Sequence, residues 1–206
     1  FNSPSPKTSI LESCGNSVFR EPKTEFQQQN YKLVANLPYN IATAVIMKFL
    51  ESDNPPQQII VMIQKEVAQR IVAVPPHMNK LAIFCQLYSE PKIIDIVPPT
   101  AFWPKPKVDS AIVAFYPRKE LNSFLPKGRS LTPSSGQFEQ IVSLGFSHPR
   151  KTLLNNLYEG RPGTGSKKEI ILWLKENNIQ PSQRPETLNI HNWLCLAKTF
   201  KTLHNN

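Results

Sequence analysis

Short apolar runs alternate with amphipathic segments along the first half of the chain. The runs are rich in Val and Ile and are short enough for single strands, at residues 31–35, 58–63, 92–97 and 111–116. Between them the apolar residues recur every three or four positions, which is typical of helices, at residues 41–50, 65–73 and 81–88. This alternation predicts an α/β sheet with helices on both faces.

The pattern changes after Pro117. The segment from there to Ser135 is rich in Pro, Ser, Lys and Gly, a composition that predicts a linker. Beyond it the spacing is helical with almost no strand signal, at residues 138–144, 152–158, 168–177 and 191–200. We therefore predict an α/β domain in residues 1–117, and a linker with a small all-helical domain in residues 118–206. The polar residues 1–30 are expected to form a solvated lead-in.

The composition allows a folded core and favours an anionic partner. A chain of 206 residues, 40% of them hydrophobic, suffices for one large or two small domains. The net charge of +9 favours a polyanionic partner, with nucleic acid as the first candidate. A solvated basic surface is the alternative, and composition leaves both open.

Cysteine usage and hydropathy predict a soluble, intracellular protein. Cys14, Cys85 and Cys195 are far apart, with no C-x-x-C pair and no paired His at ligand spacing, so we expect neither a disulfide framework nor a metal site. The apolar runs are too short to cross a membrane, and the N-terminus lacks a secretory pattern. The expected protein is a monomer of the cytoplasm, with an organelle as the alternative.

A short motif, Asn36-Leu37-Pro38-Tyr39, follows the first predicted strand. Methylation of an exocyclic amine requires acceptors for its hydrogens and a flat surface for the extruded base. The Asn36 Oδ1 and the Leu37 carbonyl are candidate acceptors, and Tyr39 is the candidate surface. Pro38 favours an extended Leu37, whose carbonyl can then point out of the strand end. The motif is typical of the catalytic loop of an adenine amino-methyltransferase, although an ordinary turn is the alternative.

Residues 98–110 form a second motif, Pro-Pro-Thr-Ala-Phe-Trp-Pro-Lys-Pro-Lys-Val-Asp-Ser. Its four prolines stiffen the chain and remove backbone donors, so an interior strand is not expected. If Phe102 faces Tyr39, the two rings can sandwich a purine, and such stacking contributes about 1–3 kcal/mol per base. The alternative is that Phe102 and Trp103 fill an edge of the core.

Together and in this order, the two motifs resemble those of the ribosomal RNA adenine dimethyltransferases. This family includes the small-subunit dimethylases and the erythromycin-resistance methyltransferases. The resemblance begins near Gly15 and extends to the end of the chain, and it also covers residues 64–70 and 184–188. The last of these segments lies in the predicted helical domain and favours the small-subunit branch.

The resemblance implies a Rossmann-like domain that binds S-adenosylmethionine and dimethylates adenines, two adjacent ones in small-subunit ribosomal RNA. It places Asn36 between the donor and the amine, assigns a backbone acceptor to Leu37, and lets Tyr39 and Phe102 clamp the base. No metal is needed, because the sulfonium donor is already activated and the enzyme mainly positions the reactants.

Basic residues at two places are candidate contacts to RNA phosphates. Arg150 and Lys151 replace a more basic run of the family, with Pro149 interrupting the approach to the helix. Lys105 and Lys107 belong to the second motif. Each of these residues that contacts a phosphate adds about one unit to the slope of the logarithm of the binding constant against the logarithm of the salt concentration. A solvated helix start is the alternative for Arg150 and Lys151.

The chain departs from the family upstream of Asn36. A glycine-rich loop and an acidic residue should hold the donor there, yet no G-x-G precedes Asn36. Asn16 lies about where the family has an acidic residue that contacts the adenine of the donor. It is the candidate cofactor contact, with a simple turn residue as the alternative. We therefore expect a C-terminal portion of a larger enzyme that binds the donor poorly by itself.

Two rival functions remain open from the sequence, besides a large-subunit RNA target. A DNA adenine methyltransferase uses a similar loop, but Leu37 in place of its first proline and the Phe102 loop disfavour this reading. A non-catalytic RNA-binding factor on the same scaffold is disfavoured by the intact Asn36 and Tyr39. The absence of a recognisable donor loop leaves that second rival possible.

Overall fold

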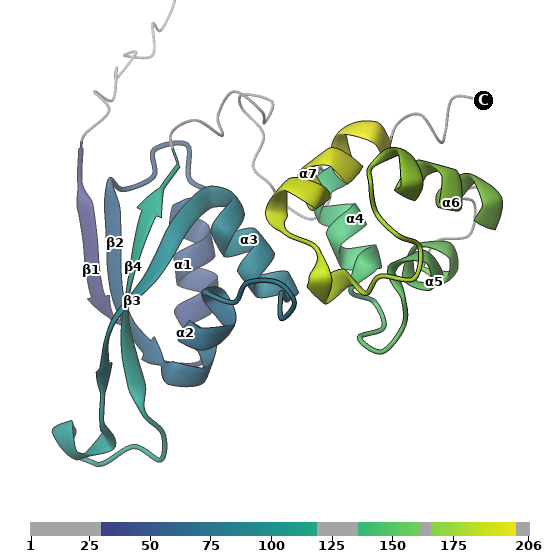
Figure 1. Ribbon diagram of the computed structural model, residues 1–206. Helices are drawn as coiled ribbons and strands as arrows, with labels where there is room; N and C mark the ends of the chain where they lie inside the picture. The colour runs from purple at the N-terminus through teal and green to yellow at the C-terminus, as the bar shows by residue number, and fades with distance from the viewer. Residues whose placement is uncertain (1–29, 119–135, 161–165, 201–206) are drawn as a thin grey trace, which may run out of the picture.

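A mixed sheet forms the first part of the fold. The computed structural model describes residues 30–118, 136–160 and 166–200 (Figure 1). Its four strands, in the spatial order β1-β2-β4-β3, are β1 (Lys32–Asn36), β2 (Gln58–Gln64), β3 (Ser89–Val97) and β4 (Ser110–Pro117). The first two strands are parallel, whereas β4 is antiparallel to both of its neighbours. The strands predicted from the apolar runs are confirmed.

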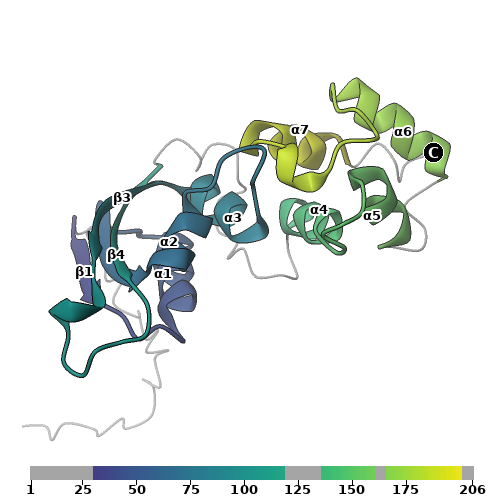
Figure 2. The ribbon, with the colours of Figure 1, turned by 60° about the horizontal axis from the view of Figure 1, so that its bottom comes forward.

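The helices of this part cover one face of the sheet. They are α1 (Ala42–Leu50), α2 (Lys65–Ile71) and α3 (Lys80–Tyr88), and Figures 1 and 2 show all of them on the same side. Ile59, Val61 and Ile63 of β2 are buried, while Val34 of β1 is 73% exposed. Within the described residues, the expectation of helices on both faces is therefore wrong. That expectation came from the alternation of strand and helix segments along the chain, which does not specify the face of the sheet on which each helix packs.

The described residues from 136 onward form helices and the loops between them, with no strand among them. Their helices are α4 (Gln137–Gly145), α5 (Leu153–Glu159), α6 (Lys167–Glu176) and α7 (Ile190–Thr199), with a short 3₁₀ helix, η3 (Pro185–Thr187). Capping boxes begin α6 at Ser166 and α7 at Asn189, where they satisfy otherwise unpaired backbone N–H groups. Trp193 is fully buried at the centre and stacks on Phe146 with ring centroids 5.5 Å apart.

Helix α3 joins the sheet to the helical part (Figure 2). The Phe84 ring meets Phe138 of α4 edge-on at 6.1 Å, and the Met78 N–H donates a hydrogen bond of 3.0 Å to the Glu186 carbonyl. Buried residues of both parts form one continuous apolar cluster. Most of the predicted linker lies outside the described residues, so the division at residue 117 stays a prediction.

Ionisable groups close to this junction are buried or half-buried. Burial raises the pKa of Glu139 in α4, whose Oε2 has no hydrogen-bond partner among the residues that the structure describes. Burial, and to a smaller extent Glu139, also raises the pKa of Glu51 at the end of α1. Burial raises the pKa of the free Cys85 thiol to about 12, so this group stays protonated at neutral pH.

Candidate active site

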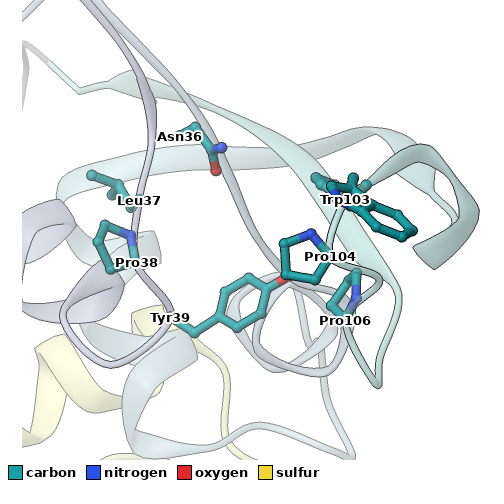
Figure 3. A pocket seen from close by; sticks show the side chains of 8 residues that line it. Asn36, Leu37, Pro38, Tyr39, Trp103, Pro104 and Pro106 are labelled. Atoms are coloured by element: carbon teal, nitrogen blue, oxygen red, sulfur yellow. The ribbon is translucent and has the colours of Figure 1, made fainter.

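Both sequence motifs line one pocket at the carboxyl end of β1. The pocket has a volume of about 350 Å³, and the first motif supplies one wall while the β3–β4 loop supplies the other (Figure 3). Its lining residues are Asn36, Leu37, Pro38, Tyr39, Phe102, Trp103, Pro104 and Pro106. The tertiary structure thus brings the candidate catalytic residues Asn36, Leu37, Pro38, Tyr39 and Phe102 together in one pocket.

The wall formed by the first motif is a tight turn between β1 and α1. Asn36 is the last residue of β1, and its carboxamide points into the pocket (Figure 3). The Pro38 carbonyl accepts hydrogen bonds of 3.1 Å from the N–H groups of Ile41 and Ala42. These bonds fix the turn that leads from the motif into α1, while the Asn36 side chain stays exposed. The Asn36 carboxamide is therefore available to a ligand.

A hydrogen bond across the pocket floor fixes the Tyr39 ring. Its hydroxyl lies 2.8 Å from the Oγ of Ser110, which is fully buried at the start of β4. Because the ring is tethered at its far end and is 38% exposed, it presents an aromatic surface to the pocket. Ser110 was not predicted from the sequence as a positioning residue, although it is the last residue of the second motif.

The opposite wall is the stiff loop between β3 and β4. A 3₁₀ turn, η1 (Pro99–Ala101), precedes Phe102, whose N–H donates a 3.3 Å hydrogen bond to the Pro99 carbonyl. Phe102 is partly buried and lines the pocket, whereas Trp103 is 98% exposed. The alternative in which Trp103 fills a core edge is therefore wrong. The clamping of a base between Phe102 and Tyr39 stays a prediction.

An ion pair secures the far end of this loop. The Lys65 ammonium lies 2.8 Å from Asp109 Oδ2, and the Lys65 N–H donates a 3.0 Å hydrogen bond to the Asp109 carbonyl. Both side chains are more than a third exposed, so the ion pair contributes at most about 1 kcal/mol. Its structural effect is to anchor the start of α2 to the last loop residue before β4.

The predicted RNA contacts fall into separate groups. Lys105 and Lys107 are exposed on the β3–β4 loop, next to the pocket. Arg150 and Lys151 lie between α4 and α5, away from the pocket; Arg150 is exposed, and Lys151 pairs with Glu159. The hydrogen bond from Lys151 lowers the pKa of Glu159. Asn16, the candidate cofactor contact, lies outside the described residues.

Asn156 holds the turn that carries Arg150 and Lys151. It is fully buried, and its Nδ2 donates hydrogen bonds to the carbonyls of Gly145 at 2.6 Å and His148 at 3.1 Å. This role was not predicted from the sequence, because an Asn inside a helical pattern has no distinguishing local signal. Its role arises only because the α4–α5 turn packs against it in the folded chain.

Neither a metal cluster nor a membrane-spanning helix is found in residues 30–118, 136–160 and 166–200. They contain no cluster of three or more His, Cys, Asp or Glu side chains able to hold a metal ion. None of the described helices combines the length and the apolar content required to span a membrane.

The sheet and the position of the pocket define a class of protein. In open α/β sheets, ligands bind outside the carboxyl ends of parallel strands, which is where this pocket lies. The crystal structure of a dimethyladenosine transferase from Plasmodium falciparum is similar, with a TM-score of 0.67 and 23% identity, over 84% of this chain and 69% of that chain. The fold is therefore that of a methyltransferase.

Sequence comparison shows the family. The family model described as ribosomal RNA adenine dimethylase matches residues 10–198, and the chain belongs to that family. The ribosomal RNA small subunit methyltransferase A of Dehalococcoides mccartyi (strain ATCC BAA-2266 / KCTC 15142 / 195) is 38% identical over 94% of this chain and 64% of its own length. The protein of the same name from Clostridioides difficile (strain 630) is 40% identical over 83% of this chain and 57% of its own length. The chain thus spans less than two thirds of these relatives.

Proposed function

We propose that the protein transfers methyl groups from S-adenosylmethionine to the exocyclic amine of adenines in small-subunit ribosomal RNA. The observation that carries the proposal is the pocket where Asn36 at the end of β1 meets the tethered Tyr39 ring and the Phe102 loop. Family membership and the names of the relatives support the choice of substrate. We propose that the protein acts as a monomer, in the cytoplasm or an organelle.

The pocket residues suit the positioning of an amine. On this proposal the Asn36 Oδ1 and the Leu37 carbonyl accept the two hydrogens of the adenine amine and direct its lone pair at the methyl group. The Tyr39 ring supports the base from one side, and Phe102 supports it from the other. Orientation of this kind accounts for most of the acceleration expected, because a methyl transfer from a sulfonium needs no general base on the protein.

The residues at the pocket fit only the reacting end of the donor. Asn36 is the described side chain that we assign to it, whereas no Asp or Glu is among the residues that line the pocket. Acidic residues are the usual ligands of a ribose in such folds. When bound, the donor supplies an activated methyl group. We expect weak or no binding of S-adenosylhomocysteine by this chain in isothermal titration, and a micromolar constant would contradict that expectation.

The direct test is transfer of labelled methyl groups to undermethylated small ribosomal subunits. It should be run with this chain and with the chain extended by any coding sequence that precedes Phe1. Asn36→Ala should lower the transfer rate by about 100-fold or more, because the amine loses its orientation, while RNA affinity changes little. Formation of dimethyladenosine by the parent protein supports the proposal.

The same experiment separates the rival functions. A non-catalytic RNA-binding factor would bind the subunits yet transfer no methyl group, and Asn36→Ala would then change nothing measurable. Transfer to DNA or to large-subunit particles in preference to small-subunit particles would reassign the substrate and leave the reaction intact.

RNA binding is proposed to depend on the basic residues at both places. Lys105 and Lys107 are exposed, so their replacement by Ala should reduce the salt dependence of binding by about one unit each. Arg150→Ala should act similarly, whereas Lys151→Ala should act less because Glu159 already neutralises Lys151. An unchanged slope for any of these variants would remove that residue from the interface.

A further inference from the structure

Trp103 occupies an unusual position for its residue type. Its side chain is 98% exposed, whereas Trp173 and Trp193 are 3% and 0% exposed. Tryptophan has the largest apolar surface of any side chain, and complete exposure forgoes the free energy of burying that surface. The proposed clamp of Tyr39 and Phe102 gives Trp103 no role, so its exposure requires a separate explanation.

The loop holds Trp103 out in solvent. Hydrogen bonds from Ala101 to Pro98 and from Phe102 to Pro99 stiffen the backbone that precedes it, and prolines at positions 104 and 106 restrict the backbone that follows. Figure 3 shows its ring directed away from Tyr39, on the outer side of the pocket. The indole thus stands at the pocket mouth, where both of its faces are accessible.

The surroundings of Trp103 favour RNA over an apolar protein partner. Lys105 and Lys107 are exposed on the same loop, and the whole chain carries a net charge of +9. An aromatic ring flanked by cations is the common arrangement for binding single-stranded nucleic acid, because the ring stacks on a base and the cations contact phosphates.

We propose that Trp103 stacks on the base of the nucleotide adjoining the target adenosine and holds the RNA strand at the pocket mouth. This inference rests on the proposed function. Extrusion of an adenosine leaves its neighbour without one stacking partner, and RNA-binding proteins commonly supply an aromatic ring to such unstacked bases. Trp103 directly follows Phe102 in the chain, so its ring is in reach of the nucleotide next to the one in the pocket.

Fluorescence of this chain tests the inference directly. Because the other tryptophans are buried, quenching by acrylamide reports mainly on Trp103. The probe is an RNA hairpin with two adjacent adenosines in its loop, the second of them replaced by 2-aminopurine. Binding should protect Trp103 from acrylamide and should quench the 2-aminopurine emission.

Affinity variants provide the second measurement. Trp103→Ala should weaken binding of the hairpin by about 5- to 150-fold, whereas Trp103→Phe should retain most of the affinity because it keeps a stacking surface. Leu172→Ala is the matched control: it removes a side chain that is 60% exposed on α6, and it should leave the affinity unchanged. Thermal unfolding of each variant should match the parent, since these side chains are exposed.

The outcomes separate the inference from the proposed function. Suppose that the chain binds the hairpin, that RNA does not change the acrylamide quenching of Trp103, and that Trp103→Ala binds as tightly as the parent. The stacking role is then wrong, while RNA binding stands. If the chain does not bind the hairpin at all, both the stacking role and an RNA substrate are contradicted. Equal losses for Trp103→Ala and Leu172→Ala would also refute a specific stacking contact.

Discussion

Replacement of Asn156 by Ala should destabilise the protein more than the removal of so small a side chain suggests. The carboxamide is fully buried and donates to two backbone carbonyls of the α4–α5 turn, those of Gly145 at 2.6 Å and His148 at 3.1 Å. Gly145 is buried, so water cannot easily replace the lost donor there. His148 is exposed, and water can take over that bond.

The expected loss of unfolding free energy follows from this difference in burial between the carbonyls of Gly145 and His148. The unsatisfied Gly145 carbonyl costs about 1–3 kcal/mol, and the exchange of the His148 bond for water costs about 0.5–1 kcal/mol. The better helix propensity of Ala returns about 0.6 kcal/mol. The expected net loss is about 1–3.5 kcal/mol, which lowers the melting temperature by about 2–14 °C for a chain of this length.

Urea unfolding followed by circular dichroism measures the loss on this chain. Asn155→Ala is the matched control, because its side chain is only partly buried and makes no hydrogen bond to any residue that the structure describes. Its stability should stay within about 0.5 kcal/mol of the parent. Equal unfolding free energies for Asn156→Ala and Asn155→Ala would refute the assignment of Asn156 as the support of this turn.

Four further substitutions, used in three tests, probe the packing of the site and of the core. Tyr39→Phe and Ser110→Ala should each slow methyl transfer. In the double variant the two effects on kcat/KM should depart from additivity by about 0.5–1.5 kcal/mol. Additive effects would mean that the 2.8 Å bond does not orient the ring. Burial raises the pKa of Glu139, so the native state holds this proton more tightly than the unfolded chain, and stability is lost as pH rises from about 4.5 through the raised pKa. Calorimetry should therefore show Glu139→Gln more stable than the parent at pH 7 but not at pH 4, and an equal difference at both values would contradict this. Gly145→Ala would place a Cβ in steric clash with Trp193 Cη2 and should cost about 1–3 kcal/mol of unfolding free energy. An unchanged value would show that the indole can shift.

Local patterns in the sequence were enough to predict most of the elements. Strand and helix periodicities depend on neighbouring residues, and the strands and helices lie where these periodicities placed them. The motif at Asn36 and the motif at Phe102 each carried a chemical signal, and their joint resemblance to one family is confirmed by the family match. The sequence by itself therefore determined the fold class, the family and the residues of the pocket.

Only the tertiary structure decided how these pieces are arranged. Tyr39 and Ser110 are 71 positions apart, and no local pattern indicates that their hydroxyls meet. The one-sided cover of the sheet and the exposure of Trp103 likewise depend on which surfaces other segments reach. Burial of an apolar side chain lowers the free energy of the folded protein, but the sequence does not show which other segments will cover that side chain. For that reason Trp103, read from sequence as possible core filling, stands in solvent at the mouth of the pocket.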